Sequence, residues 1–173
     1  MPEYKEFTVA PPALRPSEYT AALIHALQCD RDRVRGKNVL EMGSGSGVIL
    51  AALADLGAAS LCGIDVEDDA VAAGTFLLQE LGHGKLGKIH QGSMWQPVTG
   101  RRFDLIAANL PHFAMEDHEV PGRHTTWSAG GPNGRRLLDP FLHGLSARIL
   151  NGLTLVRGHN ILKASPPRQQ WRQ

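Results

Sequence analysis

The stretch Val39-Leu40-Glu41-Met42-Gly43-Ser44-Gly45-Ser46-Gly47 decides the fold of this chain of 173 residues. It predicts a short apolar strand and a glycine-rich turn, after which the run from Val48 to Leu53 opens a helix. Glycines let the backbone pass close to a ligand and adopt positive φ angles. A second apolar run ends in Asp65, about twenty residues further on, where a carboxylate can accept hydrogen bonds from ribose hydroxyls. The pattern therefore predicts a nucleoside-cofactor site.

The glycine spacing indicates which cofactor binds there. A dinucleotide fingerprint has its third glycine one residue later than Gly47, and a carboxylate at Glu41 would repel a pyrophosphate but suits a cationic ligand. The E-x-G-x-G-x-G pattern resembles motif I of class I methyltransferases, whose cofactor, S-adenosylmethionine, carries a sulfonium, an amino group and a ribose. The alternative is a glycine-rich turn of another α/β protein, and the combination with Asp65 argues against it.

Composition predicts one globular domain over residues 1–173, with an N-terminal arm at 1–15 and an atypical polar tail at 158–173. The formal net charge of +1 gives no strong attraction to nucleic acid or membrane. The start of the chain is unlike a signal peptide, and the two cysteines suggest no disulfide framework, so a cytoplasmic location is expected. The histidines do not follow a metal-binding spacing, and no metal is expected, although His112, His118 and His124 share one loop.

Alternating elements predict a doubly wound, mostly parallel α/β sheet with helices on both faces. A helix begins near Pro16, and the helix at 68–81 is expected to bury Val71, Phe76, Leu77 and Leu81. A long loop at 110–133 is expected to be functional or mobile. The remaining expected elements are strands at 38–42, 60–65, 88–91, 103–108 and 154–156, and helices at 47–56 and 134–150.

A second motif, Asn109-Leu110-Pro111-His112-Phe113, closes the strand at 103–108. It resembles the N-P-P-Y signature of methyltransferases that act on planar nitrogens, with Leu110 for the first proline and His112 for the tyrosine. The lone pair of such a nitrogen is delocalised, so a site must accept hydrogen bonds from its N–H groups. The Asn109 side-chain oxygen and the Leu110 carbonyl can do so, and Pro111 biases Leu110 to an extended conformation. Stacking on the substrate is expected from His112 or Phe113. The alternative is an ordinary strand-ending turn.

Two further segments extend the resemblance to HemK-like glutamine methyltransferases without their helical N-terminal domain. Arg15-Pro16-Ser17-Glu18-Tyr19-Thr20 is similar to the segment before their first helix, and Trp127-Ser128-Ala129-Gly130-Gly131-Pro132-Asn133-Gly134-Arg135 is similar to their W-A-G-G-x-x-G-R segment. Members of this family methylate the glutamine of a Gly-Gly-Gln motif in class I release factors. The resemblance therefore implies a Rossmann-like methyltransferase fold, S-adenosylmethionine as cofactor and a protein substrate, for which a release factor is the candidate.

The resemblance also implies the site residues. Ser93 stands where the family has an acidic residue for the adenine amino group, and Met94 or Trp95 is expected to pack on the adenine ring, with core packing as the alternative for Trp95. The catalytic residues are expected to be Asn109, Leu110, Pro111 and His112. The cofactor-binding residues are expected to be Thr20, Glu41, Gly43, Ser44, Gly45, Gly47, Asp65, Val66, Ser93, Met94 and Asn109.

The C-terminal part departs from the family pattern. The family's last strands are expected to be missing, which would leave the strand at 154–156 as an uncovered edge able to pair with another chain. A homodimer through this edge or an activating subunit is therefore a candidate partner. Three other functions stay open, namely methylation of an amino group on a nucleic-acid base, methylation of a small molecule, and a non-catalytic cofactor-binding or scaffold role. Nucleic acid is disfavoured because no basic stripe is present.

Overall fold

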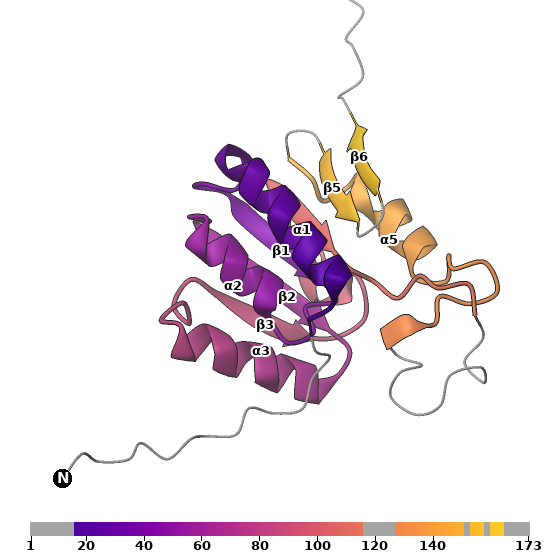
Figure 1. The fold of residues 1–173 in the computed structure, drawn as a ribbon, viewed down its shortest axis with the longest axis horizontal. Helices are drawn as coiled ribbons and strands as arrows, with labels where there is room; N and C mark the ends of the chain where they lie inside the picture. The colour runs from indigo at the N-terminus through magenta and orange to yellow at the C-terminus, as the bar shows by residue number, and fades with distance from the viewer. Residues whose placement is uncertain (1–15, 116–126, 151–152, 158–159, 165–173) are drawn as a thin grey trace, which may run out of the picture.

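Four parallel strands form the central sheet, in the order β3-β2-β1-β4 (Figure 1). The computed structural model describes residues 16–115, 127–150, 153–157 and 160–164. β1 and β2 have the predicted boundaries, and β3 also includes Gly87. The strands are β1 (Asn38–Met42), β2 (Ser60–Asp65), β3 (Gly87–Gln91) and β4 (Leu105–Ala108).

Helices cover both faces of the sheet, because successive strand residues point to opposite sides and enter two cores. Val39 and Leu61 pack toward α1, α2 and α3, whereas Leu40 and Cys62 pack toward α5 and the 3₁₀ helix η2. A strand that is buried on both faces reads as a continuous apolar run. The observed fold is the predicted doubly wound α/β sheet. The helices are α1 (Glu18–Cys29), α2 (Val48–Asp55), α3 (Asp68–Glu80), η2 (Gln96–Val98) and α5 (Leu138–Leu145).

The order of the strands reverses beside β1, which lies between β2 and β4. In open α/β sheets ligands bind beyond the carboxyl ends of the strands at such a switch point. The glycine turn follows β1, Asp65 ends β2 and Asn109 follows β4. These three features therefore share one edge of the sheet, as the sequence predicted.

Two elements are shorter than predicted. Phe103 lies outside β4 and forms a parallel bridge with Ile149, and its N–H donates to the Arg148 carbonyl at 2.7 Å. α5 therefore occupies only part of the predicted helix at 134–150, because the chain after Leu145 turns to run beside Phe103. These pairings join residues that are far apart in the sequence, so no local sequence pattern predicts them.

Small residues on α3 bring this helix close to the glycine turn. The predicted inward face of α3 is wrong for Leu81, whose side chain is 50% exposed. Val71 and Leu77 do pack against the core, but they are only partly buried. The buried positions are Ala70, Ala73, Gly74 and Leu78. A Cβ on Gly47, whose φ is 78°, would lie 2.7 Å from the Gly74 Cα, so contact between the turn and the helix requires glycine.

Gly47→Ala is expected to lower the free energy of unfolding by about 2–5 kcal/mol. Roughly 1–2 kcal/mol comes from the left-handed backbone and about 1–3 kcal/mol from overpacking against Gly74. Gly45→Ala is the matched control, because Gly45 also has a positive φ of 49° but nothing lies within 4 Å of a Cβ there. It should cost only about 1–2 kcal/mol. Urea unfolding of both variants measures the difference, and equal losses would contradict the close packing.

An antiparallel pair of strands, β5 (Leu153–Arg157) and β6 (Asn160–Ala164), lies beside β4. The prediction that the last strands are missing and that 158–173 is a polar tail is wrong for residues 160–164. Ile161 is a residue type that favours strands, and pairing satisfies the backbone groups that the two strands turn toward each other. β5, expected as an uncovered edge, is therefore paired with β6.

Candidate active site

A cavity of about 240 Å³ lies at the carboxyl ends of β1, β2 and β4. Predicted site residues from four separate segments line it together: Gly43, Gly45, Asp65, Val66, Ser93, Met94, Asn109, Leu110 and Pro111. The predicted residues Thr20, Glu41, Ser44, Gly47 and His112 are not part of its lining. The cavity joins the predicted cofactor motif to the predicted acceptor motif.

Asp65 connects the glycine turn to the start of the β2–α3 connection. Its Oδ2 accepts the Gly45 N–H at 2.8 Å, and its Oδ1 accepts the Glu67 N–H at 3.0 Å. A carboxylate has about four acceptor positions, so each oxygen can accept a further hydrogen bond from a ligand in the cavity. Asp65 can therefore bind ribose hydroxyls while it holds the turn in place.

Glu41 lies beneath the start of α2 rather than in the cavity. It has the same parity along β1 as Val39, so it faces the α2 side of the sheet, and it is only 1% exposed. Burial, together with the nearby Asp65 carboxylate, raises the pKa of Glu41 well above its usual value, although a hydrogen bond from the Leu50 backbone opposes this. Glu41 therefore accepts a hydrogen bond at the start of α2, and its raised pKa widens the pH range in which its carboxyl group is uncharged.

The raised pKa of Glu41 predicts a pH dependence of stability. The native state binds this proton more tightly than the unfolded chain does, so the stabilisation is complete below the unfolded pKa of about 4.3. It is lost as the pH rises through the folded pKa. Glu41→Gln should therefore raise the melting temperature at neutral pH and flatten its dependence on pH. Melting curves from pH 4 to pH 9 check this, and an unchanged slope would contradict a raised pKa of Glu41.

Two other predicted cofactor residues have internal roles in this structure. Thr20 is buried in α1, and its Oγ1 accepts the Ser17 N–H at 3.2 Å within a capping box. Ser44 is 4% exposed, and its Oγ has no hydrogen-bond partner among the described residues. A buried hydroxyl without a partner is unfavourable. Because Ser44 lies between the cavity-lining Gly43 and Gly45, a polar ligand group at the turn would relieve this.

The acceptor segment after β4 presents two sides. Asn109, Leu110 and Pro111 line both the main cavity and a small neighbouring pocket, whereas His112 lines only the small pocket, together with Phe141. The His112 ring stacks on Phe113 at 5.0 Å with an interplanar angle of 22°. Phe113 is 39% exposed. Which of the two rings stacks on a substrate stays a prediction.

The far wall of the cavity comes from residues 127–137, a segment whose role at the site the sequence only partly indicated. Trp127, Arg136 and Leu137 line the cavity, and the Trp127 indole donates to Glu67 Oε2 at 3.1 Å. The Arg136 guanidinium donates to the Ala129 carbonyl at 2.8 Å and closes the turn between them. The wall is thus attached to the β2–α3 connection, 60 residues away along the chain.

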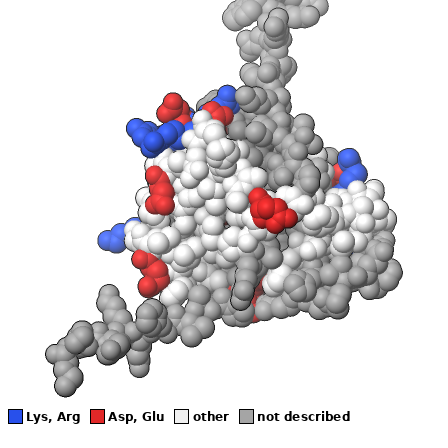
Figure 2. All heavy atoms as spheres, viewed as in Figure 1, with Lys and Arg blue, Asp and Glu red and all other residues white. Residues whose placement is uncertain are grey.

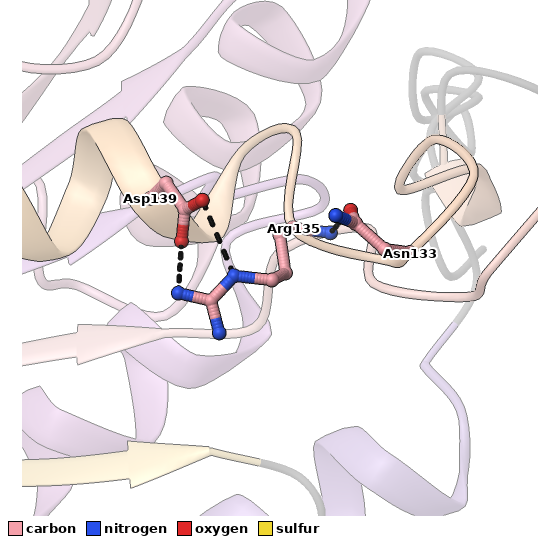
Figure 3. A network of polar contacts seen from close by, with 3 residues as sticks. All are labelled: Asn133, Arg135 and Asp139. Carbon is pink, nitrogen blue, oxygen red and sulfur yellow. Dashed lines mark hydrogen bonds and ion pairs between the residues drawn. The ribbon is translucent and has the colours of Figure 1, made fainter.

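A polar network fixes the end of this wall where it enters α5 (Figure 3). Arg135 makes a bidentate pair with Asp139, at 2.6 Å and 3.2 Å, and its backbone N–H donates to Asn133 Oδ1 at 3.1 Å. Both side chains of the ion pair are more than half exposed, so the pair stabilises the fold by only about 0.3–0.5 kcal/mol. The pair orients the segment 127–137 where it joins α5, and the side chain of the neighbouring Arg136 lines the cavity.

The segment after β3 places Ser93 and Met94 on the cavity but Trp95 in the core. Trp95 stacks on Phe141 at 5.3 Å, and its indole donates to the Pro140 carbonyl at 3.1 Å. Its core-packing alternative is therefore the observed one. Met94 has a φ of 48°, a conformation that costs a non-glycine residue energy and is common at functional sites.

The lining of the cavity fits S-adenosylmethionine. Asp65 suits the ribose, and the apolar Val66 and Met94 suit a flat ring. Within the described ranges, no group of three or more histidine, cysteine or acidic side chains could hold a metal; His118 and His124 lie outside these ranges.

No helix in the described part of the chain has the length and apolar character needed to cross a bilayer.

Comparison with known proteins identifies the family. Residues 39–123 match the family described as a methyltransferase domain. A Methanocaldococcus jannaschii protein, provisionally named a protein N5-glutamine methyltransferase, is 32% identical over 124 residues, which cover 69% of this chain and 59% of the relative. The release factor glutamine methyltransferase of Geobacter sulfurreducens is 31% identical over 116 residues, which cover 66% of this chain and 39% of the relative.

This chain therefore spans less than two thirds of the length of these relatives. The crystal structure of the ribosomal protein L11 methylase from Lactobacillus delbrueckii subsp. bulgaricus shares the fold, with a TM-score of 0.62 and 20% identity over 84% of this chain and 61% of that one. The chain belongs to the class I S-adenosylmethionine-dependent methyltransferases, close to the HemK-like glutamine methyltransferases.

Proposed function

We propose that this chain transfers the methyl group of S-adenosylmethionine to the side-chain amide nitrogen of a protein glutamine. The observation that carries the proposal is the shared cavity, which is lined both by Asp65 with the glycine turn and by Asn109 with Leu110. A cofactor and an acceptor group bound in it would lie next to each other. The names of the two relatives, both glutamine methyltransferases, support this acceptor.

The cofactor would bind along the edge formed by β1 and β2. Asp65 would accept hydrogen bonds from the ribose hydroxyls, and Ser93 would bond the adenine amino group. Val66 is 53% exposed although it is apolar, and an adenine ring packed on it would remove that surface from water. Bound there, the cofactor supplies an electrophilic methyl group on its sulfonium.

The acceptor residues would orient the amide nitrogen. The Asn109 side-chain oxygen and the Leu110 carbonyl would accept the two N–H hydrogens, which turns the nitrogen lone pair out of conjugation and toward the methyl group. Transfer of the methyl group to this nitrogen would release the cofactor as a neutral thioether, and the nitrogen would then give up one proton to water. The contribution of the protein is positioning and electrostatic stabilisation.

The surface charge favours a protein substrate over nucleic acid. On the face shown in Figure 2, the described lysines and arginines are interspersed with acidic residues rather than gathered into a stripe. The net charge is +1, and nucleic-acid binding depends on clustered basic side chains. The Gly-Gly-Gln loop of a release factor is the proposed substrate. A homodimer or an activating subunit stays a prediction, which the mass of the protein in solution would test.

Methylation of short peptides tests the proposal. The chain and S-adenosylmethionine are incubated with a Gly-Gly-Gln peptide, and with a Gly-Gly-Glu peptide as the matched control. Mass spectrometry should find one added methyl group on the glutamine only. Transfer to an adenine-containing oligonucleotide instead would support the base-methylating alternative. Cofactor binding without transfer to any of these acceptors would support the non-catalytic role.

A further inference from the structure

The acceptor segment contains an internal hydrogen bond between Leu110 and His112, the two departures from the N-P-P-Y pattern, which lie on either side of Pro111. His112 Nδ1 lies 2.8 Å from the carbonyl oxygen of Leu110. A carbonyl oxygen can only accept, so Nδ1 must carry the proton in this contact. Leu110 is the residue that lacks the fixed φ of a proline, and its carbonyl is one of the two proposed acceptors of the substrate amide.

The His112 ring is held in this orientation by aromatic contacts. Phe113 stacks on one face at 5.0 Å, and Tyr19 of α1 meets the ring edge-on at 5.8 Å with an interplanar angle of 83°. Such pairs favour offset-stacked and edge-to-face geometries, as seen here. The ring therefore has little freedom to leave the Leu110 carbonyl.

The far wall of the cavity fixes the backbone of His112. A Cβ on Gly130 would lie 2.8 Å from the His112 Cα, and a Cβ on Gly134, whose φ is 70°, would collide with the His112 carbonyl oxygen. The Phe113 N–H donates to the Ser128 carbonyl at 3.1 Å. Gly130 and Gly134 thus allow the far wall to pack against the acceptor segment.

We propose that His112 is a positioning residue, whose Nδ1–H holds the Leu110 carbonyl in the orientation that accepts an N–H of the substrate amide. The inference rests on the proposed function, because that function gives the carbonyl its role. A carbonyl oxygen has two lone pairs, so it can accept from His112 and from the substrate together. The histidine thus restrains by a hydrogen bond the same residue whose φ a proline would fix covalently.

The protonated nitrogen of His112 gives a direct test that needs no substrate. We would record ¹⁵N spectra of histidine-labelled protein at alkaline pH, where the neutral rings report their tautomers, and assign His112 from the signal lost in His112→Phe. A proton on Nδ1 is expected. A proton on Nε2 would overturn the inference, because the contact with Leu110 could not then form.

Two substitutions separate the hydrogen bond from the packing. His112→Phe keeps a ring against Tyr19 and Phe113 but removes the donor, and it should lower kcat on the Gly-Gly-Gln peptide about fivefold, as for one neutral hydrogen bond. His112→Asn places an amide N–H near the position of Nδ1 and should keep most of the activity. Calorimetry should find S-adenosylmethionine binding unchanged in both variants.

Leu110→Pro tests the proposed replacement of a covalent restraint. In the His112→Phe background it should restore kcat, so the two changes would be strongly non-additive. Equal losses in His112→Phe and His112→Asn, or no rescue by Leu110→Pro, would overturn the positioning role. If the parent protein methylates no Gly-Gly-Gln peptide, the proposed substrate is rejected instead. Two measurements then still decide whether His112 restrains Leu110. One is the tautomer of His112, and the other is the free energy of unfolding of His112→Phe, Leu110→Pro and the double variant.

Discussion

Asn109→Ala is expected to lower the rate of methyl transfer by about 100- to 1000-fold, the usual effect of removing one oriented polar group at the reacting atoms. Asn109 follows β4, is half-buried and lines the cavity beside Leu110. Without its oxygen, one amide N–H of the substrate has no acceptor, and the nitrogen lone pair stays conjugated with the carbonyl. Single-turnover rates measure the loss, and calorimetry should show that S-adenosylmethionine still binds.

Asn109→Asp is the conservative comparison, because it keeps acceptor oxygens at the same position. It should retain more activity than Asn109→Ala, although its charge changes the strength of the contact. A parental rate in Asn109→Ala would remove this residue from the catalytic machinery. Loss of cofactor binding in that variant would give Asn109 a binding role instead of a catalytic one.

Asp65→Ala is expected to weaken S-adenosylmethionine binding at least 100-fold. The carboxylate would lose its bonds to the ribose, and hydrogen bonds to a charged group contribute about 1.5–3 kcal/mol each. The Gly45 N–H at 2.8 Å would also lose its partner, so the glycine turn would be less well ordered. Calorimetric titration of S-adenosylmethionine gives the dissociation constant.

Asp104→Ala is the matched control for Asp65→Ala. Asp104 is also an aspartate that accepts a backbone N–H, from Asn38 at 2.9 Å. It precedes β4 and so lies at the opposite edge of the sheet from the cavity. Its replacement should leave the dissociation constant unchanged. Equal weakening by both variants would mean that Asp65 acts through general stability rather than through the cofactor.

The sequence was sufficient to predict the centre of the sheet, because there local pattern and tertiary structure agree. β1 and β2 are apolar runs bounded by turn residues, and parallel strands place their carboxyl ends at one edge. The ends of α5 and the pairing of Phe103 with Ile149 depend on contacts between distant residues. β6 was missed because a short segment rich in polar neighbours gives a weak strand signal.

The glycine turn, Asp65 and Asn109 were predicted to lie together because each follows a strand end. Trp127 and Glu67, which meet across 60 residues, could not be predicted from either segment alone. The position of Glu41 away from the cavity could have been predicted from the sequence. The alternation of side chains along β1 puts it on the same face as Val39 and toward α2, rather than at the end of the strand.

Titration of S-adenosylmethionine into the folded parent protein tests the central claim most directly, namely that this cavity is the cofactor site of a methyltransferase. Saturable binding with one site per chain, lost in Asp65→Ala and kept in Asp104→Ala, is the predicted result. A parent protein that is folded by circular dichroism and melts cooperatively, yet gives no binding heat at any temperature tested, would contradict the claim.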